Sequence, residues 1–215
     1  ENFLIERKEQ VQIIRLKSLK IRGVGYIRRF IGELLMPFLI NYNLKQSSVS
    51  ISQFDGIITY APSIFLGPVA KKIKKNSQCK NYLIIRDLFP QWAVDLGLIR
   101  KNRLPYFFFK LIEKNLYSVA DIIGIQTPAN MPYFKDEESS NLNVEVLQNW
   151  LSTELGDSSY CSIRINDTKL KNRTIFVYAG NLGDAQGLEI FIDLAIRFSG
   201  NKKVGFLFVG KGSSK

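Results

Sequence analysis

The sequence predicts an α/β protein built on parallel β-sheets. Two observations predict this class. Short apolar runs typical of buried strands recur along the chain, and amphipathic segments with helical spacing separate them. Strands that alternate with helices favour a doubly wound sheet with helices on both faces, and ligands then bind beyond the carboxyl ends of the strands.

The first elements are expected from side-chain alternation and from the placement of proline. Residues 11–16 alternate as a half-buried strand does. Residues 23–40 carry apolar residues at helical spacing, and we expect an interruption near Pro37, because proline removes a backbone donor. A buried strand at 56–60 follows, and the next Ala-Pro-Ser segment is suited to begin a helix that runs to about Lys75.

The same alternation continues downstream. We expect strands at 82–86, 121–126, 144–147, 175–179 and 204–209, and helices at 92–96, 104–118, 127–134 and 185–198. Three of the N-terminal strands end in residues that could bind a ligand. These are the segment 60–63 at the first strand, Arg86 with Asp87 at the second, and Thr127 at the third. Because parallel strands end at one edge of a sheet, these residues are candidates for a binding site.

A change in composition divides the chain. Residues 151–172 show no sustained periodicity and read as a connector, so we expect one domain at 1–150 and the start of another at 173–215. A strand–helix–strand unit on its own exposes its sheet edges and leaves its helix little to pack against. Together with a first residue that is Glu1 and not Met, this indicates a fragment in which both domains are incomplete.

A glycine-containing loop follows the strand at 175–179. Its residues are Gly180, Asn181, Leu182 and Gly183, and we expect it to lie at the N-terminus of the helix at 185–198. Helix-start amides and the helix dipole favour an anion there, most often a phosphate. The alternative is an ordinary tight turn between a strand and a helix.

Charge and composition limit the chemistry. The net charge of +11 indicates an anionic partner, which could be nucleic acid, an anionic membrane surface or a phosphorylated substrate. No helix-turn-helix, zinc-finger or aromatic RNA-binding signature is present, so we expect no nucleic-acid partner. The chain has no histidine, which excludes a Ser-His-Asp triad and a histidine zinc site. Cys79 and Cys161 lack a metal-binding spacing and are expected to be reduced thiols.

Three segments together resemble the family 4 glycosyltransferases. They are YLIIRDLFPQWAVDLGLI at 82–99, VLQNW at 146–150 and VYAGNLGDAQGLEIFIDLA at 177–195. The resemblance is closest to the bacterial branch that adds amino sugars such as N-acetyl-L-fucosamine during O-antigen or capsule assembly. It implies a GT-B architecture of two Rossmann-like domains, with the acceptor bound mainly by the N-terminal one and the nucleotide sugar by the C-terminal one.

The resemblance also implies a reaction. It is sugar transfer with retention from a nucleotide donor, expected to be UDP-linked, to a polyprenyl-diphosphate-linked saccharide, with no cofactor and no required metal. The enzyme would then work in the cytoplasm, peripherally on the inner face of the plasma membrane. The family's paired-glutamate motif and its opening glycine-rich loop are not in this sequence, so we expect this chain alone to be inactive.

The resemblance assigns the donor diphosphate to the loop Gly180-Asn181-Leu182-Gly183. Many family members carry arginine where Asn181 stands and lysine where Gln186 stands. Neutral amides hydrogen-bond oxygen but add no net charge, so a cation must come from elsewhere, and Lys211 is one candidate. The amide pattern is that of the amino-sugar branch.

On the acceptor side, Asp87 is the candidate catalytic residue, because a carboxylate there could accept or orient the acceptor hydroxyl proton. The structural alternatives are a helix N-cap or an ion pair with Arg86. Arg86 could contact an acceptor phosphate, with a surface ion pair as the alternative. Thr127, which precedes a proline, could contact substrate or simply cap a helix.

Two segments mix basic and bulky apolar residues, at 23–40 and 103–117. Basic amphipathic helices suit an anionic membrane surface, although the apolar residues could simply fill the layer against the sheet. We expect one face in the core and a basic rim toward lipid. The alternative function for the chain is a non-catalytic Rossmann-like module that binds a nucleotide or a membrane surface.

Overall fold

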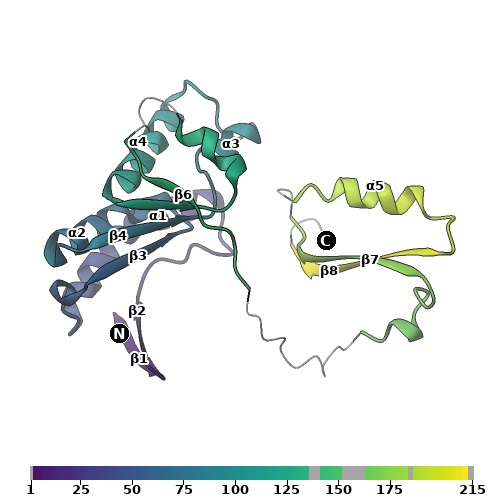
Figure 1. The fold of residues 1–215 in the computed structure, drawn as a ribbon, viewed down its shortest axis with the longest axis horizontal. Coiled ribbons are helices and arrows are strands. Elements are labelled where there is room, and N and C mark those ends of the chain that lie inside the picture. Colours follow the sequence, from purple (N-terminus) through teal and green to yellow (C-terminus); the bar gives the residue numbers. More distant parts are fainter. Residues whose placement is uncertain (1, 136–140, 152–162, 184–185, 213–215) are drawn as a thin grey trace. The chain divides into compact units, whose positions relative to one another are not determined.

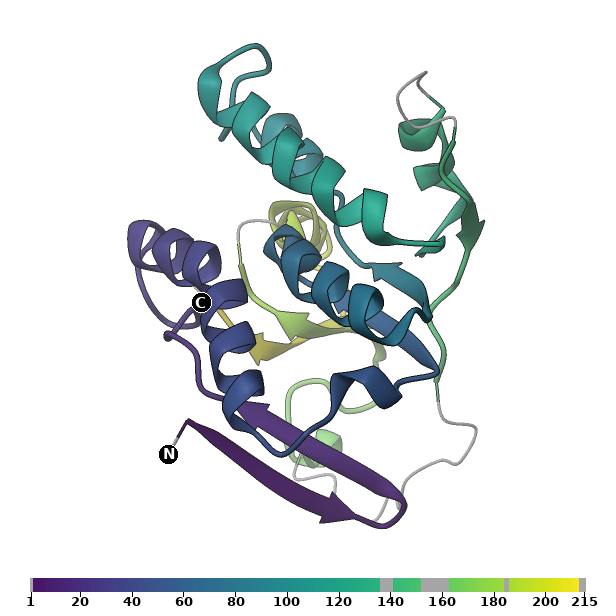
Figure 2. The same ribbon diagram turned by 90° about the vertical axis from the view of Figure 1, so that its left-hand side faces the viewer.

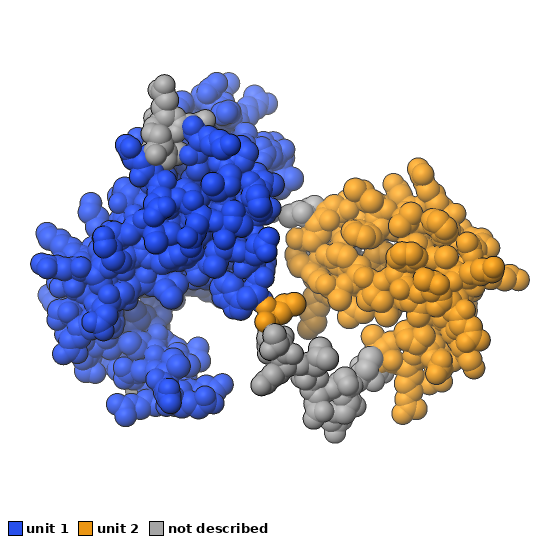
Figure 3. All heavy atoms as spheres, viewed as in Figure 1, with its two compact units in different colours: residues 1–150 blue, residues 151–215 orange. Residues whose placement is uncertain are grey.

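The structure, a computed structural model, describes residues 2–135, 141–151, 163–183 and 186–212 (Figure 1). The chain divides into two compact units, residues 1–150 and residues 151–215, which Figure 3 colours separately. Ile84 and Val177 lie in separate sheets, one in each unit. The assignment of these units to acceptor and donor stays a prediction.

A parallel sheet organises the first unit. It has the order β3-β4-β5-β6, with every neighbouring pair parallel. The strands are β3 (Gly56–Ala61), β4 (Lys80–Ile85), β5 (Ile122–Ile125) and β6 (Val144–Val146). The predicted α/β class is confirmed, and the four strands lie within one or two residues of the predicted positions.

Helices form a layer over this sheet (Figure 2). They are α1 (Tyr26–Gln46), α2 (Gly67–Ser77), α3 (Gln91–Asp95) and α4 (Leu104–Val119), with 3₁₀ turns η1 (Ile51–Gln53), η2 (Ile64–Leu66) and η3 (Pro128–Phe134). The predicted break near Pro37 is wrong, because α1 continues through that residue. In the part of the chain that the structure describes, no helix is long and apolar enough to cross a bilayer.

The expectation of helices on both faces of the sheet is also wrong for the described residues of the first unit. Leu83, Ile123 and Ile125 are almost wholly buried on one face, whereas Ile58 on the other face is 74% exposed. The strands follow one another in sequence order across the sheet. Right-handed crossovers between consecutive parallel strands all place their connecting helices on the same face.

The N-terminal residues form a separate hairpin. β1 (Phe3–Lys8) and β2 (Val11–Leu16) pair antiparallel and do not join the parallel sheet. The strand at 11–16 was predicted correctly, but its place in a parallel sheet was wrong. Its partner was missed, because a two-residue turn at Glu9 and Gln10 carries no glycine, although Glu9 adopts a positive φ of 55°.

A buried polar cluster ties α4 to η3. Glu113 is 1% exposed, and its carboxylate accepts hydrogen bonds from the hydroxyls of Tyr117 (3.1 Å) and Tyr133 (2.6 Å). Lys110 pairs with the same carboxylate at 2.5 Å. Burial, together with the nearby charge of Glu113, raises the pKa of the Tyr117 hydroxyl well above its usual range. This cluster fixes η3, and with it the segment after β5, against the helix layer.

The second unit is smaller. It contains η5 (Ile165–Asp167), β7 (Thr174–Asn181), α5 (Glu189–Arg197) and β8 (Val204–Lys211), and β7 pairs with β8 in parallel. Most of the predicted connector lies outside the described residues. The buried apolar cluster of the described chain consists only of residues from the first unit. The described residues of the second unit bury little apolar surface, although Leu188 is buried.

Candidate active site

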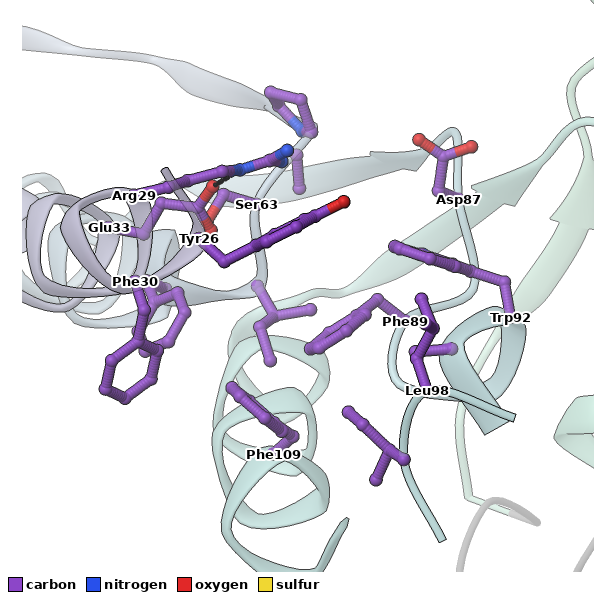
Figure 4. A pocket seen from close by; sticks show the side chains of 16 residues that line it. Tyr26, Arg29, Phe30, Glu33, Ser63, Asp87, Phe89, Trp92, Leu98 and Phe109 are labelled. Atoms are coloured by element: carbon purple, nitrogen blue, oxygen red, sulfur yellow. Dashed lines mark hydrogen bonds and ion pairs between the residues drawn. The ribbon is translucent and has the colours of Figure 1, made fainter. Parts of the chain in front are cut away.

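The carboxyl ends of β3 and β4 border a pocket of about 260 Å³ (Figure 4). Side chains reach it from α1 on one side and from the segment between β4 and α4 on the other. Its labelled lining residues are Tyr26, Arg29, Phe30, Glu33, Ser63, Asp87, Phe89, Trp92, Leu98 and Phe109. The pocket lies where ligands bind in open parallel sheets.

One side of the pocket is polar. The Arg29 guanidinium donates to Glu33 at 2.8 Å, and the Ser63 hydroxyl donates to the other Glu33 carboxylate oxygen at 3.1 Å. Ser63 is buried at the end of β3, so α1 and the sheet edge are joined at this point. The remaining donors of Arg29, which is exposed, are available to an acceptor atom of a ligand.

The other side is aromatic. Phe30 from α1 packs edge-to-face on Phe65 and Phe109, with ring centroids 6.2 and 6.0 Å apart. Phe89 packs between Phe109 (4.8 Å) and Trp92 (5.6 Å). Trp92 is 41% exposed, so its ring is partly free to pack against a ligand. A site with aromatic faces on one side and carboxylates on the other suits a sugar.

Asp87 lies in this pocket, and neither structural alternative for it is met. The N-cap of α3 is Pro90, and no side chain caps that helix. Arg86 and Asp87 both belong to the described residues, and no ion pair joins them. Asp87 is exposed, and in Figure 4 its carboxylate lies across the pocket from Arg29. It is therefore accessible to a ligand.

Arg86 does not line the pocket. Its guanidinium donates to the side chain of Asn149 at 2.8 Å, beyond the end of β6, and lies 6.0 Å from the centroid of the Tyr60 ring. Tyr60 is on the face of the sheet that carries no helices. Neighbouring residues of an extended chain point to opposite faces of the sheet. The side chains of Arg86 and Asp87 therefore lie on different faces.

Thr127 caps η3. Its hydroxyl accepts a hydrogen bond from the Ala129 backbone N–H at 3.3 Å, and it does not line the pocket. Thr127 follows β5, the strand next to β4, so it lies at the same edge of the sheet as Asp87. Its role toward a substrate stays a prediction, while its capping role is shown.

The predicted donor residues gather at the carboxyl ends of β7 and β8. Asn181 pairs in register with Lys211, and the Leu182 N–H donates to the Lys211 carbonyl at 2.9 Å. The Asn181 side chain donates to Gln186 at 3.0 Å. Asn181 and Gln186, which were expected to meet a diphosphate with their amides, hydrogen-bond each other here.

The helix after this loop begins about four residues later than expected. Gly180 and Asn181 are the last residues of β7, and α5 begins only at Glu189. The strand continues because glycine lets β8 approach closely: a Cβ on Gly210 would collide with the Gly180 carbonyl oxygen. At Gly180 an added Cβ would lie 3.3 Å from the Tyr178 hydroxyl, a tight contact that a small shift of the end of this side chain would relieve.

Sequence reasoning missed the contribution of α1 to the pocket. Tyr26, Arg29, Phe30 and Glu33 have the spacing i, i+3, i+4 and i+7, so they share one face of the helix. That spacing was available in the sequence, but nothing in it said which element this face would meet. No group of three or more carboxylate or thiol side chains able to hold a metal ion occurs among the described residues.

Comparison with known proteins links the chain to bacterial glycosyltransferases. No protein-family model matches it. It is 27% identical over 140 residues to "Probable glycosyltransferase WbjE" of Pseudomonas aeruginosa, covering 61% of this chain and 33% of that protein. It is 26% identical over 168 residues to "Putative colanic acid biosynthesis glycosyl transferase WcaI" of Escherichia coli K12, covering 75% and 41%. The alignments thus span well under half the length of either relative.

Proposed function

We propose that this chain is part of a retaining glycosyltransferase of family 4, which adds a sugar to a lipid-linked saccharide in bacterial surface polysaccharide biosynthesis. The observation that carries the proposal is Asp87 in a partly aromatic pocket at the sheet edge: it is exposed, and among the described residues it caps no helix and forms no ion pair. Similarity to two proteins named as glycosyltransferases supports the reaction class.

In the proposed reaction, the pocket holds the acceptor sugar. A hydroxyl oxygen of the acceptor sugar forms a bond to the anomeric carbon of the donor sugar. The bond between that carbon and the diphosphate oxygen breaks. The hydroxyl proton passes to the Asp87 carboxylate or to the leaving diphosphate, and Asp87 orients the hydroxyl in either case. Glu33 and Arg29 are placed to hydrogen-bond neighbouring acceptor groups.

On the donor side, negative charge develops on the leaving nucleoside diphosphate. Backbone amides around Gly183 and a cation such as Lys211 would stabilise that charge. The donor is proposed to be a UDP-linked, N-acetylated amino sugar, in line with the neutral Asn181 and Gln186. No metal or cofactor enters this scheme.

The aromatic part of the pocket fits the polyprenyl diphosphate that carries the sugar in the proposed acceptor. A polyprenyl diphosphate presents an apolar chain next to a charged group, and the pocket places Phe30 and Trp92 near Arg29. A lipid-linked acceptor would require the enzyme to work at the inner face of the plasma membrane.

The test uses the full-length protein that contains this chain. It is incubated with a panel of UDP-, GDP- and dTDP-linked sugars and polyprenyl-diphosphate saccharides, and the release of nucleoside diphosphate and the mass of the lipid product are measured. We expect transfer of an N-acetylated amino sugar, with the donor's anomeric configuration kept in the product by NMR. Inversion would refute the retaining assignment. Nucleotide-sugar binding without transfer to any acceptor would favour the non-catalytic module.

A further inference from the structure

We propose that Tyr178 is a positioning residue for the donor loop, residues 180–183, and that Gly180 serves this loop by leaving room for the Tyr178 ring. The inference rests on the proposed function, which assigns the donor diphosphate to that loop. Tyr178 itself lies in β7 before the loop and is not expected to touch the donor. Nucleotide binding and sugar transfer are separate measurements, so the positioning role and the proposed function can fail separately.

The ring of Tyr178 packs against both β8 and α5. Tyr178 is half-buried and stands opposite Phe208 in the parallel register, with ring centroids 6.3 Å apart. Phe191 of α5 packs on the same ring, with 5.5 Å between centroids. From this fixed position the Tyr178 hydroxyl donates to the backbone carbonyl of Asn181 at 2.7 Å.

The peptide unit between Asn181 and Leu182 is therefore held at both ends. Its carbonyl oxygen accepts the hydrogen bond from Tyr178, and its N–H donates to the Lys211 carbonyl at 2.9 Å. Because a peptide unit is planar, two hydrogen bonds at opposite ends leave it little rotational freedom. The direction in which the next peptide unit leaves Leu182 is thereby restricted.

That next peptide unit presents an N–H to solvent or to a ligand. Its carbonyl, that of Leu182, packs so closely on Gly212 that a Cβ there would collide with the oxygen. In a trans peptide the N–H points opposite to the carbonyl, so the Gly183 N–H points away from this contact. No backbone carbonyl of the described residues accepts a hydrogen bond from it. An oriented backbone N–H of this kind can donate to a phosphate oxygen.

Gly180 leaves open the space beside the Tyr178 hydroxyl. The two residues are two apart in β7, so they face the same side of the sheet. A Cβ on Gly180 would lie 3.3 Å from the hydroxyl oxygen, a tight contact, and 3.5 Å from the ring carbon that carries it, an ordinary one. Gly180→Ala should therefore shift the hydroxyl relative to the Asn181 carbonyl, and the clash requires that hydroxyl.

The experiment uses the full-length protein that contains this chain. UDP, GDP and dTDP are titrated into it by calorimetry, and the variants are compared with the nucleotide that the wild type binds, expected to be UDP. Tyr178→Phe keeps the ring but removes the hydroxyl, and we expect its dissociation constant to rise roughly fivefold. Tyr82→Phe is the matched control, because it removes a comparable hydrogen bond, 2.6 Å to Glu145 in the first unit, and should leave nucleotide affinity unchanged.

A double-mutant cycle tests the link between Tyr178 and Gly180. Gly180→Ala should weaken nucleotide binding roughly threefold in the wild-type background and should have no effect in the Tyr178→Phe background. Thermal melts verify that each variant is folded. Additive losses in the double variant would mean that Gly180 acts on the nucleotide directly, and would overturn its link to Tyr178.

The positioning role is overturned if folded Tyr178→Phe binds the nucleotide as tightly as the wild type, or if Tyr82→Phe weakens binding equally. It is also overturned if the wild type binds none of the three nucleotides, because the loop then holds no diphosphate. A fivefold loss in Tyr178→Phe, in a protein that transfers no sugar, would support the positioning role and refute the proposed function. Sugar transfer with unchanged nucleotide affinity in Tyr178→Phe would do the reverse.

Discussion

Replacing Asp87 by asparagine separates a catalytic carboxylate from a structural one. The substitution keeps the size and most of the hydrogen-bonding capacity of the side chain but removes its basicity. In the structure the carboxylate is exposed, caps no helix and pairs with no described cation. The folded protein therefore loses no known interaction when the charge is removed.

The expected magnitudes follow from this environment. Surface substitutions away from caps, ion pairs and the core change the free energy of unfolding by about 0.5 kcal/mol or less. A positioned acid–base group contributes typically 10²- to 10⁴-fold to the rate, which is about 3 to 5 kcal/mol of activation free energy. We expect the larger effect on the rate of the full-length enzyme and almost none on its melting temperature.

The assay measures kcat for transfer, the dissociation constant of the donor, and the melting temperature of Asp87→Asn. Asp95→Asn is the control, because Asp95 is a nearby exposed carboxylate on α3 that accepts a hydrogen bond from Gln91 and does not line the pocket. We expect donor affinity to stay nearly constant in both variants.

Two results would refute the reasoning. A sharp fall in melting temperature with an unchanged rate per folded molecule would make Asp87 structural. An equal loss of rate in Asp95→Asn would show a general effect of charge. A loss of only a few-fold, confined to Asp87→Asn, would mean that the diphosphate accepts the proton and Asp87 positions the hydroxyl.

Three further predictions follow from other contacts. Partial burial would raise the pKa of Asp121, but hydrogen bonds from Lys74, the Asn81 backbone and Lys80 outweigh it and lower the pKa from 3.8 to about 2. The ionised Asp121 should therefore add up to about 2 kcal/mol to the free energy of unfolding at pH above 4, and urea melts should show this loss as pH falls through 2. A difference between wild type and Asp121→Asn that does not change with pH would contradict this. In the full-length protein, Gly180→Val should weaken nucleotide-sugar binding at least about tenfold while the protein stays folded. Gly210→Ala should instead unfold the second unit, because its Cβ would collide with the Gly180 carbonyl oxygen, and hydrogen exchange measures that unfolding. Glu113→Leu should lower the free energy of unfolding by about 1 to 3 kcal/mol, because the buried Tyr117 hydroxyl loses its acceptor. A neutral result in chemical denaturation would show that the cluster is dispensable.

The sequence alone determined the local elements of this protein. Buried strands such as 82–86 and amphipathic helices such as 104–118 are visible because side-chain periodicity depends only on near neighbours. It also pointed to Asp87, because polar residues directly after a buried strand collect at the edge where parallel sheets bind ligands. Proline was the local signal that misled, since tertiary packing carries α1 through Pro37.

The tertiary structure alone decided which surfaces meet. That Ser63 and Asp87 face Arg29 and Glu33 across one pocket depends on packing between segments far apart in the chain. Side-chain spacing cannot reveal such a meeting, because one face of a helix can pack against many partners.

Strand order was likewise decided only in three dimensions. Backbone hydrogen bonds are chemically the same whichever strands they join, so sequence does not specify the order β3-β4-β5-β6. That order, combined with right-handed crossovers, puts the helices on one face of the sheet and leaves the other uncovered within the first unit. The same geometry turns Asp87 toward the pocket and Arg86 toward Asn149, although the two residues are adjacent in the chain.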